Sequence, residues 1–369
     1  LVRLAWGEVE LLPLARFVEL GWNSFRVAAV AAVLAVVLAV LVAYGFALPV
    51  PFVVCVMAVI LLSKPGPPMP LARGAATALV LGVMLTAGVL MVPVLENYAL
   101  TGVLLTAAVL YGVFYKGLRT ANPVTMVLVM AFALIPVAGV ADQAMVGMLS
   151  LTVATGVVVG GAVKSLSYAL FPDEPVAGMK SPAARSVSHG TAAWIALRAT
   201  VIVMPVFVLA LTNPSLYLAA IMKTVTLGQQ AGETNARSAG KELVGSTLMG
   251  ALVGACVWIG LSVLANLWML VLWLMAAALW CGTAMFGARR SAFRPSFWGN
   301  ALITALILLG PAIEDSANGK SVVQASAVRT SLFVAVALYA WATVWVLERW
   351  RESRPRPAAR TLESSEETS

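Results

Sequence analysis

Three basic residues interrupt long apolar runs, and each of them has the chemistry to bind an anion. Arg329 is the single charge in "AVRTSLFVAVALYAW", Lys223 lies within "LYLAAIMKTVTLG", and Arg198 lies within "ALRATVIVMP". A guanidinium contacts both oxygens of a carboxylate at once, whereas an ammonium acts as a compact point charge. These residue types make Arg329, Lys223 and Arg198 candidates for a path along which an organic anion moves.

Each of the three also has a purely structural explanation. An arginine near the centre of a bilayer costs about 2.5–3.5 kcal/mol on insertion scales. Arg329 would therefore pair with Glu314 or Asp315 in the preceding loop, or reach towards the surface. Lys223 would extend its aliphatic stem so that the ammonium reaches the cytoplasmic interface, and Arg198 would anchor the end of a helix. The sequence leaves both kinds of explanation open.

Acidic residues are missing from the middle of every predicted span. A proton-coupled carrier usually places a titrating carboxylate on its pathway. Asp142 and Asp315 are the nearest candidates, because they occupy matching places 19 and 20 residues after Pro123 and Pro295. We therefore predict that these two acids take part in proton coupling, with ordinary loop acids as the alternative.

Four tryptophans crowd two neighbouring apolar runs: Trp258, Trp268, Trp273 and Trp280. Aromatic belts at the membrane interface are the usual explanation for such residues. Trp273, however, falls near the middle of its predicted helix, where its ring could stack on an aromatic ligand. We include Trp273 among the candidate residues of the substrate pathway.

The composition indicates that these residues belong to a membrane protein. Of the 369 residues, 61% are hydrophobic and 11% are charged, with a mean hydropathy of +0.94. A soluble chain would carry roughly 25% charged residues. The apolar runs reach the ~18 residues typical of transmembrane helices. They lack the short alternating segments of a lipid-facing barrel. We predict an all-α integral membrane protein.

Enzymatic and metal-binding signatures are absent from the sequence. The chain has no HExxH motif, no nucleotide-binding P-loop and no Cys/His cluster, and its single histidine is His189. Cys55, Cys256 and Cys281 all lie in apolar runs, where we expect them to serve as small packing residues. We expect no enzyme activity and no cofactor.

The apolar runs predict about twelve transmembrane helices in two groups of six. The first group spans 27–47, 49–63, 74–95, 98–115, 123–140 and 144–171. The second group spans 191–211, 214–228, 242–265, 267–287, 296–312 and 321–347. Several of these spans are short or contain proline, so one of them could be re-entrant.

The predicted domains follow from this division. They are an interfacial amphipathic segment (1–24), a first membrane repeat (25–171), a cytoplasmic linker (172–190), a second membrane repeat (191–347) and a cytoplasmic tail (348–369). No cleavable signal peptide is recognised in the opening segment.

Charge orients the predicted helices. Cytoplasmic segments of membrane proteins are enriched in Lys and Arg, and the basic residues here cluster in alternate loops and in the tail. This pattern places both termini in the cytoplasm. It also explains the formal net charge of +8 through topology and contact with anionic lipid, so we expect no nucleic acid as a partner. The basic loop residues are Lys64, Arg73, Lys116, Arg119, Lys180, Arg185, Arg237, Lys241, Arg289, Arg290 and Arg294.

The two groups resemble each other along the chain. "LARGAATALVLG" (71–82) aligns with "AGKELVGSTLMG" (239–250), so that Arg73 matches Lys241. "YKGLRTANP" similarly matches "FGARRSAFRP", and "SFRVAAVAAV" matches "ALRATVIVMP". Because each group has an even number of spans, the two copies are predicted to be parallel repeats, with a substrate site between them near the midplane. Gly250 and Gly254 in "GALVG" form a small-xxx-small pair that predicts close helix packing.

These repeated motifs resemble the fusaric acid resistance and aromatic acid exporter family. Each half opens with a segment such as "FRVAAVAAVLA" or "LRATVIVMPV" and continues with a basic loop and a glycine-rich helix such as "GSTLMGALVG". The resemblance implies an efflux protein of the bacterial inner membrane that works with a periplasmic membrane-fusion adaptor and exports aromatic carboxylates. Larger members carry a cytoplasmic domain, which this sequence lacks, so the resemblance is to a compact branch.

The expected function is therefore proton-driven efflux of a small organic anion. The expected partners are the lipid bilayer, the adaptor and the anion, and a homo-oligomer remains open. An organic-anion channel is the first alternative, because a basic pathway without buried acid suits passive flow. A membrane scaffold that anchors an adaptor without transporting anything is the second.

Overall fold

The computed structural model describes residues 36–62, 71–120, 125–170, 188–233, 236–286, 289–319 and 321–353, and throughout these ranges its regular elements are helices, with no strand. Valine, alanine and glycine are abundant in the sequence, but a bilayer favours segments that satisfy their own backbone hydrogen bonds. The all-α prediction is confirmed for the described residues. The predicted amphipathic segment 1–24 lies outside them.

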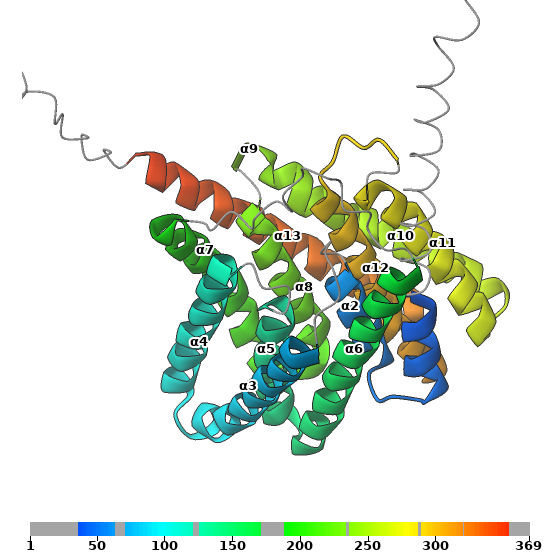
Figure 1. Ribbon diagram of the computed structural model, residues 1–369, viewed down its shortest axis with the longest axis horizontal. Helices are drawn as coiled ribbons and strands as arrows, with labels where there is room; N and C mark the ends of the chain where they lie inside the picture. The colour runs from blue at the N-terminus through cyan, green and yellow to red at the C-terminus, as the bar shows by residue number, and fades with distance from the viewer. Residues whose placement is uncertain are drawn as a thin grey trace, which may run out of the picture.

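The helices follow one another with short connections (Figure 1). They are Val36–Gly45, α2 (Pro51–Leu62), α3 (Leu71–Asn97), α4 (Ala99–Thr120), α5 (Thr125–Ala141), α6 (Gln143–Leu170), α7 (His189–Thr212), α8 (Pro214–Glu233), α9 (Ala236–Ala239), the π-helix η1 (Gly240–Val244), α10 (Gly245–Val263), α11 (Leu267–Met285), α12 (Pro295–Ala317) and α13 (Val322–Glu352).

Eight of these helices are long and apolar enough to cross a membrane: α3, α4, α6, α7, η1 with α10, α11, α12 and α13. They indicate a multi-pass membrane protein. Val36–Gly45, α2 and α5 are apolar but shorter. The helix α8 is 20 residues long and carries lysine, two glutamines and glutamate, which lowers its apolar character.

The helix α12 forms the centre of the bundle. Of its most apolar window, 89% is buried inside the protein, compared with 28% for α3 and α13 and 22% for α4. Helices that expose an apolar surface are suited to contact lipid, whereas a helix buried on all sides contacts other helices. Polar groups on α12 are consequently held by protein and not by lipid.

The packing of the helices follows a pattern that recurs in the two groups. In the first group α3 packs on α5 and α2 packs on α6, and in the second group α10 packs on α12 and α8 packs on α13. Two contacts join the groups, α5 against α8 and α12 against α2. Figure 1 shows α3 to α6 gathered in one part of the molecule and α10 to α12 in another, with α13 extending past α7.

Each of the twelve predicted segments contains a helix, but several helices extend beyond the predicted ends. The helix predicted to end at residue 312 continues to Ala317, and the one predicted to end at residue 347 continues to Glu352. Hydropathy marks where an apolar surface ends, whereas a helix ends where its backbone hydrogen bonds stop. The predicted tail therefore starts inside α13.

Candidate functional site: a buried lysine and a polar cluster

Lys223 lies in the interior of the bundle, halfway along α8. Its side chain is fully buried, and its Nζ donates a hydrogen bond of 2.6 Å to Oγ1 of Thr304 on α12. No carboxylate of the described residues lies within ion-pair distance of Lys223. The side chain thus reaches sideways into the bundle, and the expectation that it extends to the cytoplasmic interface is wrong.

Neutral polar side chains continue from Thr304 towards the start of α12. The hydroxyl of Thr304 donates to the backbone carbonyl of Asn300 at 2.6 Å. Nδ2 of Asn300 donates to Oε1 of Gln230 at 2.8 Å and to Oγ of Ser246 at 2.7 Å. Together with Lys223, these residues form what we call the Lys223 cluster, which joins α8, α10 and α12. Every member is buried.

Close packing of α10 on α12 brings the two helices together at Thr304. A Cβ atom added to Gly250 would lie 2.5 Å from the carbonyl oxygen of Ala301 and 2.5 Å from Cβ of Thr304. At Gly254 the nearest atoms belong to Ala305, at 3.5 Å. The predicted small-residue contact is confirmed, and Gly250 is the position where it is tightest.

A buried carboxylate lies at the edge of the Lys223 cluster. Nε2 of Gln230 donates to the backbone carbonyl of Glu242 at 3.2 Å, and Oε2 of Glu242 is buried with no hydrogen-bond partner among the described residues. Glu242 belongs to η1, a π-helical turn, and such turns occur frequently at functional sites. Asn300 also has a buried oxygen, Oδ1, without a partner in the described part of the chain.

Arg329 pairs with Asp315, as one of its two explanations predicted. Nη1 of Arg329 lies 2.6 Å from Oδ2 of Asp315, and the two side chains are 18% and 10% exposed. Asp315 lies in the last turn of α12 and not in a loop. This ion pair joins the end of α12 to the start of α13.

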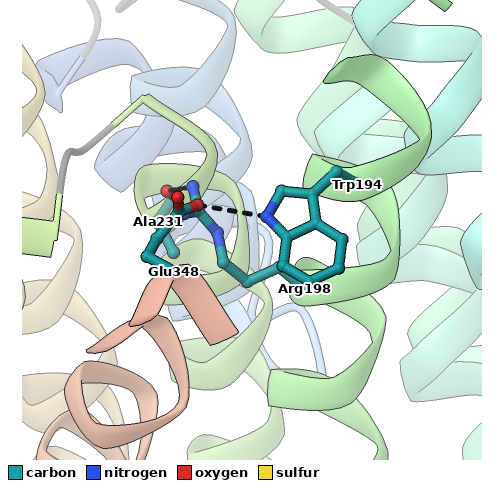
Figure 2. A network of polar contacts seen from close by, with 4 residues as sticks. All are labelled: Trp194, Arg198, Ala231 and Glu348. Carbon is teal, nitrogen blue, oxygen red and sulfur yellow. Dashed lines mark hydrogen bonds and ion pairs between the residues drawn. The ribbon is translucent and has the colours of Figure 1, made fainter. Parts of the chain in front are cut away.

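Arg198 pairs with a carboxylate at the other end of α13 (Figure 2). Its Nη1 donates to Oε1 of Glu348 at 2.8 Å, and its Nη2 donates to the backbone carbonyl of Ala231. Nε1 of Trp194 donates to the same oxygen of Glu348 at 3.1 Å. The Arg198 side chain is 4% exposed and that of Glu348 is 21% exposed. This network joins α7, α8 and α13.

The expectation that all membrane-buried charges are basic is wrong. Asp315, Glu242 and Glu348 are buried or partly buried within helices. The predicted helix ends placed Asp315 and Glu348 in a loop and in the tail, and Glu242 was the first residue of its predicted helix. Asp142, in contrast, is exposed between α5 and α6, where Oδ1 accepts a hydrogen bond from the backbone N–H of Ala144 at 2.9 Å.

The predicted pathway residues lie at different levels of the bundle. At 1.5 Å per residue, the α13 positions that hold Arg329 and Glu348 are about 28 Å apart, and Thr304 lies about 16 Å along α12 from Asp315. Lys223 is therefore between the two ion pairs. Trp273 is in none of these networks: it packs its ring over Gly260 of α10 and is 38% exposed.

The neutral members of the Lys223 cluster escaped the sequence analysis, which considered charged and aromatic residues. Helical spacing could have found them. Lys223 and Gln230 are seven residues apart on α8, and Asn300 and Thr304 are four apart on α12, so each pair shares one helix face. A polar face on an apolar helix needs partners inside the bundle.

We compared the chain with models of protein families, with curated proteins and with solved structures, and none of the three comparisons gives a match.

Proposed function

We propose that this protein is a proton-driven efflux transporter for small aromatic organic acids. The observation that carries the proposal is Lys223, a fully buried cation whose one partner in the described chain is a hydroxyl group. A buried charge without a counter-charge is costly. The carboxylate of a substrate would supply the missing negative charge, and the surrounding apolar side chains would accept an aromatic ring.

The two ion pairs suit a carrier that opens to one side at a time. Asp315 with Arg329 and Glu348 with Arg198 lie towards opposite ends of α13, with Lys223 between them. An anion that arrives at either arginine competes with the resident carboxylate. In this mechanism each ion pair closes one end of the path, and the substrate anion opens it by exchange.

The packing pattern supports two parallel six-helix repeats. The contacts α3–α5 and α10–α12 correspond, as do α2–α6 and α8–α13, and the contacts between the groups are α5–α8 and α12–α2. Repeats of this kind hold substrate between them in transporters. With twelve spans and the observed bias of Lys and Arg, both termini and the linker would be cytoplasmic. A reporter fused after Ala177 tests this, because periplasmic activity would contradict it.

The resemblance in sequence completes the proposal. Membership of the fusaric acid resistance and aromatic acid exporter family would place the chain in the bacterial inner membrane, as a component that works with a periplasmic membrane-fusion adaptor. The motifs that carry this part are the repeated basic loops and glycine-rich helices, and Gly250 shows one of them making the tight helix contact that such a motif provides.

Proton coupling requires a group that changes charge between the two access states. Asp142 and Asp315 are the candidates with matching positions, and Glu242 joins them because it is buried next to the Lys223 cluster. Asp142→Asn combined with Asp315→Asn, and separately Glu242→Gln, should abolish gradient-driven export while exchange of anion for anion continues. Undiminished gradient-driven export in all of these variants would remove the three acids from the mechanism.

Flux in proteoliposomes tests the function itself. Protein reconstituted with benzoate as the probe should show saturable efflux that is driven by an imposed proton gradient. Lys223→Gln should abolish this flux, whereas Lys116→Gln, at an exposed position of α4, should not change it. Equal flux in Lys223→Gln and wild type would contradict the proposed role of the buried cation.

An anion channel is the second candidate, because no carboxylate of the described residues pairs with Lys223. A channel would give unitary currents across a planar bilayer and no coupling to protons. Absence of both flux and currents would leave the scaffold that anchors an adaptor.

A further inference from the structure

A second basic site lies at the junction of α11 and α12, away from the Lys223 cluster. The guanidinium carbon of Arg289 lies 4.8 Å from the centroid of the Trp280 ring and 4.8 Å from that of Trp298. The two indoles meet edge to face, with centroids 5.0 Å apart and planes at 88°. Arg289 therefore occupies a right-angled corner between two aromatic rings.

Hydrogen bonds hold this corner in shape. Nε1 of Trp298 donates to Oγ of Ser291 at 2.8 Å, and the backbone N–H of Phe293 donates to the same oxygen at 3.1 Å. The backbone N–H of Arg289 donates to the carbonyl of Thr283 at 2.8 Å. The site is thus built before any ligand arrives, which reduces the entropic cost of binding.

The guanidinium of Arg289 retains its hydrogen-bonding capacity. Its side chain has no hydrogen bond and no ion pair with any residue of the described ranges, although cation–π contacts hold it against both rings. A guanidinium carries five N–H donors in a planar fork that matches phosphate and carboxylate. The charge is therefore fixed in position while its donors await an anion.

The surroundings indicate which anion binds. Trp280 is near the end of an apolar candidate span and is 40% exposed, a position typical of a membrane–water interface. Large apolar side chains, Trp268, Leu272 and Trp273, are exposed along the same helix, and they offer a surface for acyl chains. The exposed Arg290 adds positive charge beside Arg289.

We propose that the corner formed by Arg289, Trp280 and Trp298 binds the phosphate of an anionic phospholipid headgroup. The guanidinium contacts two phosphate oxygens, and the acyl chains follow the apolar outer surface of α11. The charge bias places this loop at the cytoplasmic leaflet, where anionic lipids attract basic residues. This site does not depend on whether the protein transports anything.

Lipid titration of the full chain in detergent tests the site. Phosphatidylglycerol should bind and raise the melting temperature, whereas phosphatidylcholine and inorganic phosphate should have little effect. Arg289→Gln should weaken phosphatidylglycerol binding about tenfold, as expected for loss of a charge-assisted pair. The matched control is Arg349→Gln, because Arg349 lies over a single ring, that of Trp345, at 5.5 Å, and this variant should bind as wild type does.

Arg289→Lys separates charge from geometry and covers the case in which the glutamine variant does not fold. It retains the positive charge but loses the planar fork, so its binding should also be weaker than that of wild type. Wild-type affinity in either variant, or equal binding of phosphatidylcholine, would overturn the proposal. A matching response to inorganic phosphate would do so as well, because it would identify a site for free anions.

Discussion

Lys223 and Arg198 are both buried cations in the second group of helices, but their partners are of opposite kinds. Arg198 has a carboxylate, Glu348, at 2.8 Å and a backbone carbonyl, whereas Lys223 has a hydroxyl alone among the described residues. A cation with a carboxylate partner holds helices together. A cation without one is available to an anion that comes from solution, and this difference separates a structural position from a candidate binding position.

Arg329 falls between these two cases. It has a carboxylate partner at 2.6 Å, but both side chains are more exposed than the side chain of Arg198. Screening by solvent reduces the contribution of such a pair to stability. Arg329 could therefore hold α12 to α13 in one state and release Asp315 for an anion in another. The three cations form a series that substitution can test.

The largest expected effect is on stability, at Arg198. Arg198→Gln should lower the free energy of unfolding by about 3 kcal/mol, the lower end of the range for breaking a buried pair, because Glu348 retains some contact with solvent. Denaturant unfolding in detergent micelles measures it. Adding Glu348→Gln should restore part of the loss, because no unpaired charge remains. Wild-type stability in Arg198→Gln would show that the pair does not hold the helices.

Lys223 should give the opposite result. Lys223→Met replaces the cation with an apolar side chain of similar length, so the unfolding free energy should stay the same or rise. Anion flux should fall at least about tenfold, the loss expected when a charge-assisted contact disappears. Proteoliposome flux and unfolding are measured on the same preparation. A large loss of stability with normal flux would reverse the comparison between Lys223 and Arg198.

Hydropathy and charge predicted the helices well because apolar segments in lipid have few alternatives to a helix. The pairing of Arg329 with Asp315 could be anticipated, because 14 residues that turn from one helix into the next allow the chain to fold back. Glu348 was missed because α13 continues past its apolar part as a helix with Arg and Trp on its surface. Which helix packs on which was not predictable, so the meeting of Lys223 with Thr304 required the structure.

The next effect concerns the packing that positions Thr304. Gly250→Ala would place a Cβ atom 2.5 Å from the Ala301 carbonyl, so α10 must move away from α12 at a cost of about 1–3 kcal/mol. Anion flux should fall as well, because Thr304 shifts relative to Lys223. Gly254→Ala is the matched control, since its nearest atoms lie at 3.5 Å. Equal stability of the two variants would contradict the tight contact at Gly250.

A smaller change in stability is expected at Arg329. Arg329→Gln should lower the unfolding free energy by about 1 kcal/mol, because partly exposed pairs contribute little. If Arg329 also contacts the passing anion, carboxylate flux should fall more than the amount of protein in the membrane does. Flux per molecule of protein separates these two effects. Normal flux together with reduced stability would assign Arg329 a structural role like that of Arg198.

The smallest effect is expected at Asp142, which is the counterpart of Asp315 by position but not by surroundings. Asp142 is exposed and accepts a hydrogen bond from the backbone N–H of Ala144 at the start of α6. Asparagine accepts the same bond at a helix N-terminus, so Asp142→Asn should change stability by less than about 0.5 kcal/mol and gradient-driven export by less than about twofold. Asp315→Asn leaves Arg329 without its carboxylate partner and should have the larger effect on both. A loss of proton coupling in Asp142→Asn alone would show that an exposed acid carries the proton, and would restore the symmetry between the two repeats that their side-chain contacts do not display.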